Sequence, residues 1–161
     1  MNAPATSHEL SVTRLIHASP ETVYRTWTHR IEEWWVPRPW TARIIEQDLR
    51  TGGRSAIEVQ GPEGERFPHD GIFLEVVPNE RIVITNAFTD GWQPKGHMDS
   101  DCDFPVVNIV TFAPEGDGTR YTARVLHWTD EAVKAHEAMG FHQGWAQVTA
   151  QLADLAEGET R

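Results

Sequence analysis

Hydrophobic positions follow two different spacings along this chain. In residues 54–59 and 119–128 apolar and polar side chains alternate, which is typical of β-strands with one buried face. In residues 141–155 large apolar residues recur every three or four positions, which is the spacing of an amphipathic helix. Turn sequences separate the β-type segments at residues 52–53, 61–64, 78–79 and 114–118. The pattern therefore predicts strands joined by short turns, followed by one helix.

A helix start follows the first predicted strand, which covers residues 10–17. Ser19 can cap this helix, and the next two residues, Pro-Glu, suit its first turn. A break near residues 28–29 divides the segment into two short helices, and prolines at positions 37 and 39 end the second. The further strands are predicted at residues 42–47, 54–59, 67–77, 81–88, 106–112 and 119–128.

The last predicted helix runs from a cap at Thr129-Asp130 to about Ala156. Gly140 and Gly144 both fall inside it, and each is less favourable there than alanine by about 1 kcal/mol. Two reasons would justify them: close approach of another backbone, or space left for a bound molecule.

These elements predict one α+β domain at residues 9–157, after a polar lead-in at residues 1–8. Short connections favour a curved antiparallel β-sheet, and the long C-terminal helix must bury its apolar stripe against the inner face of that sheet. The two short helices after the first strand would close one end. A curved sheet wrapped around one helix leaves room for an interior cavity.

Short motifs spread over residues 10–156 resemble those of a known family. In order they are residues 17–20 (His-Ala-Ser-Pro), Val23, Trp27-Thr28, Trp34-Trp35, Pro37, Asp48-Leu49, Gly52-Gly53, Gly71, Glu75, Pro78, Arg81, Gly118-Thr119 and Gly144-Trp145. At this spacing the chain resembles the activator of heat-shock-protein-90 ATPase homologue family, within the SRPBCC or START-like superfamily. The resemblance implies a helix-grip (START-like) fold with a hydrophobic cavity between the sheet and the C-terminal helix. It implies no catalytic motif.

The net charge is −10, and this narrows the classes of partner. A surface of that sign repels phosphate backbones and anionic lipids, so we expect neither nucleic acid nor a membrane as partner. Cys102 is the only cysteine, so no disulfide forms within the chain. The sequence has no leader pattern and no apolar run of membrane-spanning length, and we therefore expect a cytoplasmic protein.

Four tryptophans cluster in the region of the two short helices, at positions 27, 34, 35 and 40. They either form an aromatic wall at the mouth of the cavity or are the packing units of the helices themselves. Trp35 and Trp40 are the better candidates for ligand contact, because they lie near or beyond the end of the second helix.

Two histidines, His127 and His136, are the most informative polar pair. Strand parity places His127 on the same face as Val125, hence inward, and His136 lies four residues before Gly140. Both can serve as hydrogen-bond anchors or as an acid/base pair, or each can be a buried histidine satisfied by a backbone carbonyl. The predicted ligand-binding residues are Trp35, Trp40, His127, His136, Met139, Gly140 and Gln143.

Residues 97–103 (His-Met-Asp-Ser-Asp-Cys-Asp) resemble the start of a metal site. A calcium loop fails because Phe104 stands where glycine is needed and Val110 where the bidentate glutamate belongs. A structural zinc site requires more ligands than His97 and Cys102. We therefore expect a solvated acidic loop, with no metal and no cofactor.

The predicted connection at residues 89–105 is long for a compact domain, and such loops are often functional. It can act as a lid over the cavity mouth or as an extended edge in a dimer. A homodimer is compatible with the open sheet edges of such folds.

Three functions remain open. The first is binding of a small hydrophobic molecule in the interior cavity. The second is a co-chaperone-like module that meets a chaperone or another protein through its surface. The third is a cyclase- or hydratase-like enzyme that uses the cavity histidines. The first requires unfilled interior space, and the third requires a titratable group within reach of the ligand.

Overall fold

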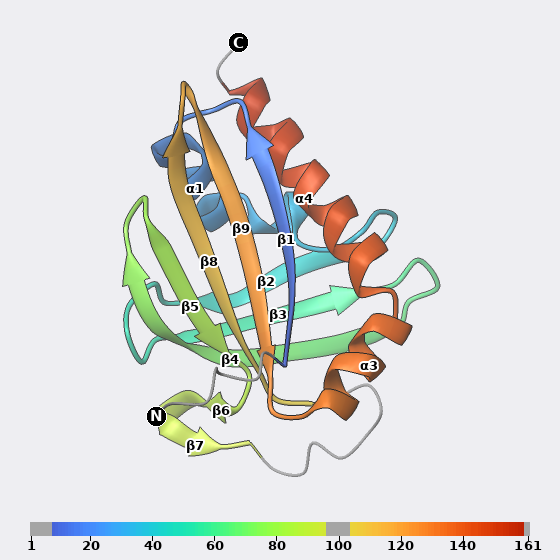
Figure 1. Cartoon of the computed structure of the whole chain (residues 1–161). Helices are drawn as coiled ribbons and strands as arrows, with labels where there is room; N and C mark the ends of the chain where they lie inside the picture. Colours follow the sequence, from blue (N-terminus) through green and yellow to red (C-terminus); the bar gives the residue numbers. More distant parts are fainter. Residues whose placement is uncertain (1–7, 96–103, 160–161) are drawn as a thin grey trace.

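Seven strands form one antiparallel sheet in the order β1-β9-β8-β5-β4-β3-β2. The computed structural model describes residues 8–95 and 104–159. Figure 1 shows the strands at one end of the sheet crossing those at the other end steeply, so the sheet is strongly curved, with α4 beside it. The strands are β1 (Glu9–Ile16), β2 (Thr41–Gln47), β3 (Arg54–Gln60), β4 (Arg66–Val77), β5 (Arg81–Thr85), β8 (Val106–Glu115) and β9 (Gly118–His127). The predicted α+β fold with its curved antiparallel sheet is confirmed.

The alternation in β9 is the clearest link from sequence to sheet. Tyr121, Ala123 and Val125 are buried, whereas Arg120 and Arg124 are exposed. The hairpin partner β8 is paired with β9 along its whole length. One face of this hairpin therefore contributes to the core and the other faces solvent.

Two short helices, α1 (Pro20–His29) and α2 (Ile31–Trp34), follow β1 as predicted. The hydroxyl of Ser19 accepts a hydrogen bond from the backbone nitrogen of Thr22 over 3.2 Å, which satisfies a donor at the start of α1. The two helices are separated only by Arg30, whose φ of −123° is not helical. Their buried residues Val23, Trp27, Ile31 and Trp34 belong to the main hydrophobic core.

The predicted single C-terminal helix is wrong, because two helices occupy that stretch: α3 (Asp130–Ala138) and α4 (Phe141–Gly158). The Thr129 cap is present, since its hydroxyl accepts from Ala132 N over 3.1 Å. The break lies at Gly140, whose φ of 95° is left-handed and favours glycine over residues with a Cβ. His136 consequently belongs to α3 and not to a face shared with Gly144.

The strand predicted at residues 81–88 ends early. Beyond Thr85 the chain forms a small hairpin, β6 (Phe88–Thr89) and β7 (Gln93–Pro94), joined by the 3-10 turn η1 (Asp90–Trp92). The side chain of Asn86 bonds the backbone of Phe104 and Val106 at 3.1 and 2.8 Å, which fixes the point of departure from the sheet. Part of the predicted 89–105 connection is therefore ordered, and residues 96–103 lie outside the described part.

The main core lies between the inner face of the sheet and α4. Phe73, Ile82 and Val110 of the central strands are fully buried, as is Leu152 of α4. The backbones of β4 and β5 approach closely at Gly71, where a Cβ would meet the backbone oxygen of Thr85. None of the helices described here combines the length and apolar character needed to cross a membrane.

Candidate functional site

Two neighbouring cross-strand pairs on the inner face of the central strands differ in burial. Ile82 on β5 pairs with Val110 on β8, and both have 0% exposed surface. Two residues along the same face, Ile84 pairs with Asn108, and both are partly exposed. The inner face of the sheet is therefore less completely covered at the Ile84–Asn108 pair than at the Ile82–Val110 pair.

The N-terminal half of α4 has open space at one position. Gly144 lies near the apolar stripe of α4 that also carries Phe141 and Val148. A Cβ built on Gly144 would meet no atom within 4 Å. Trp145, the next residue, is partly exposed and packs against both hydrophobic clusters of the core. The Cβ position of Gly144, which is partly exposed, therefore faces open space.

Asn108 is a polar residue in an apolar part of the sheet. It shares the inner face with Val110, and it is opposite Ile84 on one neighbouring strand and Val125 on the other. Its side-chain oxygen Oδ1 is buried and has no hydrogen-bond partner among the described residues. A buried, unpartnered polar group destabilises a fold by about 1–3 kcal/mol.

His127 and His136 are joined directly. Nδ1 of His127 is 3.0 Å from the backbone oxygen of His8, and Nε2 of His127 is 2.9 Å from Nδ1 of His136. Because a carbonyl oxygen only accepts, Nδ1 of His127 carries the proton and its Nε2 accepts from Nδ1 of His136. The chain of hydrogen bonds links β9 to the start of β1 and to α3.

Both histidines of the pair are neutral near pH 7. Burial lowers the pKa of His127 below its ordinary value of 6.5. Burial, together with the neighbouring His127, lowers the pKa of His136 to about 4. The pair is therefore a hydrogen-bonded neutral unit rather than a cationic one.

Aromatic rings surround His136. Its ring centroid is 5.0 Å from that of Phe104 and 5.0 Å from that of Phe141, and Trp145 is next at 6.3 Å. Phe141 and Trp145 stack on each other at 5.0 Å. The pair thus lies under the first turns of α4, and parity placed His127 correctly, with only 6% of its surface exposed.

Trp35 and Trp40 lie against a different part of the sheet. Trp35 meets the ring of His69 edge-on at 5.2 Å, and Trp40 tilts over Phe67 at 5.9 Å. Both partners belong to β4, which two strands separate from β9 in the sheet. The structure therefore gathers the predicted residues into two groups and not one.

The remaining predicted residues are at the α3–α4 junction. Met139 is 54% exposed and Gln143 is also exposed. Gly140 forms the left-handed joint between the two helices. None of these three is buried in the core, and their predicted role in binding stays a prediction.

The sequence 97–103, considered above for a metal, lies outside the described residues. Within residues 8–95 and 104–159, no three His, Cys, Asp or Glu side chains gather as a metal ion requires.

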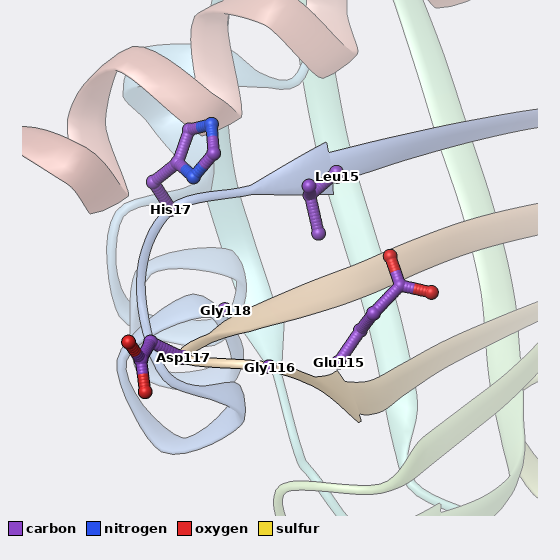
Figure 2. Close-up of a pocket in the computed structure, with 6 residues that line it drawn as sticks. All are labelled: Leu15, His17, Glu115, Gly116, Asp117 and Gly118. Carbon is purple, nitrogen blue, oxygen red and sulfur yellow. The ribbon is translucent and has the colours of Figure 1, made fainter.

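A hollow at the far end of the β8–β9 hairpin is shown in Figure 2. Its lining residues are Leu15, His17, Glu115, Gly116, Asp117 and Gly118. Glu115 is engaged by the guanidinium of Arg120 at 2.9 Å, and the hollow opens to solvent. None of the predicted site residues contributes to it.

Two residues of the site, Ile84 and Asn108, were not predicted from the sequence. A signal for Asn108 was present, because the parity of β8 places it on the same face as Val110 and Phe112. The partial exposure of Ile84 has no counterpart in sequence, since it depends on which elements pack over β5 in three dimensions.

A family model described as "Activator of Hsp90 ATPase homolog 1-like protein" matches residues 17–157. Among solved structures, a protein from Nitrosomonas europaea is 33% identical, with a TM-score of 0.85, over 98% of this chain and 99% of that one. A protein from Chromobacterium violaceum is 26% identical, with a TM-score of 0.75, over 93% and 97%. The AHSA1 protein from Silicibacter pomeroyi is 19% identical over 94% and 99%, with a TM-score of 0.67, and shows likeness of fold alone. No curated protein matches the chain.

Proposed function

This chain belongs to the family of activator of Hsp90 ATPase homolog 1-like proteins, and from that premise we propose that it binds a small, mostly apolar molecule. The molecule lies between the inner face of the sheet and the first half of α4. Binding of this kind needs a largely preformed, mostly apolar space with a few polar groups.

The change in burial along β5 and β8 carries the proposal. Ile82 and Val110 are fully buried, whereas the adjacent Ile84–Asn108 pair on the same face is partly exposed. Gly144 of α4 borders open space at its Cβ position. A protein interior is normally close-packed, so unfilled space beside the core is a feature that a ligand can use.

Aromatic side chains supply the walls that such a ligand needs. Trp145 of α4 and Trp35 at the end of α2 both pack against the main core. Both are partly exposed, so each has ring surface left to cover a bound molecule.

The direct test is native mass spectrometry of gently purified protein, compared with the denatured chain. Extra mass that is lost on denaturation supports the proposal and begins to identify the ligand. Gly144→Leu then fills the space next to α4, and we expect it to abolish the extra mass.

Gly158→Leu is the matched control, because Gly158 is also helical and also has open space at its Cβ position, but it is exposed at the end of α4. Retention of the ligand by Gly144→Leu would contradict the proposed location. A chain that carries no extra mass, and that binds none of a panel of apolar probes, would contradict the function.

A co-chaperone role is the second candidate, and the description of the family favours it. It predicts that added protein stimulates the ATPase rate of an Hsp90 chaperone. Gly144→Leu separates the two functions, because a change confined to the interior leaves a surface-mediated stimulation intact.

Acid/base catalysis by the histidine pair is the weakest of the three functions. A general base works best when its pKa is near the working pH. Burial instead lowers the pKa of His136 to about 4, and both nitrogens of His127 are already engaged. These features favour a neutral, structural pair.

A further inference from the structure

The helix α3 is weakly embedded in the fold. None of its nine residues is buried within the part of the chain that the structure describes, whereas α1, α2 and α4 each place residues in the main core. A helix of this length is also too short to be stable in water by itself. The folded position of α3 therefore depends on a small number of contacts with the strands and with α4.

A second, smaller hydrophobic cluster lies against α3. Its buried residues are Leu10 of β1, Val125 of β9 and Phe141 of α4. Val133 of α3 packs against this cluster and is itself partly buried. The main core is a separate cluster, and it includes Val110 on the neighbouring strand β8. The contact of α3 with the interior is therefore with the second cluster.

Two side-chain hydrogen bonds join α3 to the strands next to this cluster. Nδ1 of His136 donates to Nε2 of His127 over 2.9 Å, and His127 is the next inward residue after Val125 on β9. The carboxylate of Asp130 is 2.7 Å from Nδ1 of His8, just before β1. The Asp130 side chain is 67% exposed, and pairs exposed to water stabilise little. The bond of His136 is therefore the stronger attachment of the two.

Both ends of α3 are joined to the fold by two-residue connections. Trp128 and Thr129 connect it to β9, and both are exposed. Met139, which is 54% exposed, and Gly140, whose φ of 95° is left-handed, connect it to α4 (Figure 1). Hinges are commonly a few residues at the ends of elements that absorb changes in φ and ψ. These connections let α3 move without a change in the main core.

We propose that α3 is a hinged lid over the second hydrophobic cluster, and that it detaches from the sheet as a unit while the main core stays folded. Loss of the hydrogen bond between His136 and His127 releases the lid. The apolar side chains of the second cluster then become accessible to water. Opening requires no ligand, so the lid is independent of the proposed function.

The test is thiol labelling at one position under the lid and at one position outside it. Val125→Cys and Val110→Cys are each made together with Cys102→Ser, so that each protein has a single thiol. The two valines are a matched pair, because both have 0% exposed surface and they lie on the paired strands β9 and β8, but only Val125 belongs to the second cluster. The rate of reaction with iodoacetamide is measured in native buffer, and the free energy of unfolding of each variant is measured in urea.

We expect the thiol of Val125→Cys to react about a hundredfold faster than the global unfolding of that variant allows, because local opening requires less free energy than unfolding of the whole domain. The thiol of Val110→Cys should react only through global unfolding. Addition of His136→Ala should raise the rate at Val125→Cys by a further factor of about five to ten, which is the range of one neutral hydrogen bond. Addition of Lys134→Ala, at an exposed position of α3, should leave that rate unchanged.

Reaction of both thiols at rates limited by global unfolding would overturn the inference. An unchanged rate at Val125→Cys after addition of His136→Ala would also overturn it, because α3 would then not be the element that covers this position. If a cysteine variant does not fold, amide hydrogen exchange of the unmodified protein is measured instead. The amides of α3 are expected to exchange faster than those of residues 148–156 in α4, and one common rate for both segments would overturn the inference.

Discussion

The side-chain amide of Gln151 on α4 donates to the backbone oxygen of Trp34, at the end of α2, over 3.0 Å. The same nitrogen is 2.9 Å from the backbone oxygen of Val36, and the side-chain oxygen accepts from Arg38 N at 3.2 Å. The buried side chain of Gln151 therefore satisfies three backbone groups of residues 34–38, a segment that has no regular secondary structure to satisfy them. Because Trp35 lies inside this segment, the hydrogen bonds of Gln151 on α4 help to fix the position of the Trp35 ring.

The first prediction concerns the three hydrogen bonds between the side chain of Gln151 and the backbone of residues 34–38. Gln151→Leu keeps the bulk of the side chain but leaves three backbone groups of residues 34–38 without a partner. We expect the free energy of unfolding in urea to fall by about 3 kcal/mol, since each orphaned group destabilises by about 1 kcal/mol or more. Gln143→Leu, at an exposed position of α4, should change it by less than about 0.5 kcal/mol. Equal effects of the two substitutions would contradict a stabilising role for the hydrogen bonds of Gln151.

The second prediction is a loss of stability in mild acid. The pKa of His136 is lowered to about 4 in the folded chain, against 6.5 for the exposed ring. Between these two pH values the unfolded chain binds a proton that the folded ring does not. The contribution of this histidine to the free energy of unfolding is therefore fully present above pH 6.5, and it is lost as the pH falls towards 4. We expect a loss of about 1 kcal/mol between pH 7 and pH 5, less than the full linkage because the ring is partly open to solvent.

His136→Gln tests the assignment of that loss. Glutamine keeps a side-chain N–H that can donate to Nε2 of His127, and it does not titrate. Urea unfolding of the variant should therefore show a smaller decrease in stability between pH 7 and pH 5 than wild type. An unchanged decrease would assign the acid sensitivity to other groups.

The third prediction concerns the close approach of β4 and β5 at Gly71. A Cβ at this position would lie 2.3 Å from the backbone oxygen of Thr85, and backbone cannot rotate away as a side chain does. Gly71→Ala should therefore destabilise the fold by about 3 kcal/mol or more, as measured by thermal unfolding. A variant with wild-type stability would mean that β4 and β5 separate at this point without consequence for the core.

The fold could be predicted from the sequence to the extent that it rests on local patterns. Alternation in β9 gave the buried face, and Ser19-Pro20 gave the start of α1, because each signal depends on neighbours in the chain. The prediction of one C-terminal helix was wrong because apolar residues keep a helical spacing on both sides of Gly140. A left-handed backbone at one glycine leaves no trace in that spacing.

The candidate site depends on contacts that the sequence does not record. Parity correctly predicted that His127 is buried, but its use by His8 and His136 depends on the meeting of β1, β9 and α3. In the same way, Asn108 is readable as an inward residue, whereas its lack of a partner depends on what every neighbouring strand does with its own polar groups. The periodicity of the sequence predicts on which face of the sheet a side chain lies, whereas its hydrogen-bond partner depends on how the elements pack.

The last prediction uses Gly144 to decide whether the interior beside α4 is filled. Alanine is favoured over glycine inside a helix by about 1 kcal/mol, and a methyl group at Gly144 meets no atom within 4 Å. Gly144→Ala should therefore stabilise the protein against urea by about 0.5–1 kcal/mol, as Gly158→Ala should at the exposed end of the same helix. A destabilised Gly144→Ala beside a stabilised Gly158→Ala would mean that the space is occupied by protein. That result would remove the physical basis for an interior ligand, because a bound molecule needs the volume that the methyl group would enter.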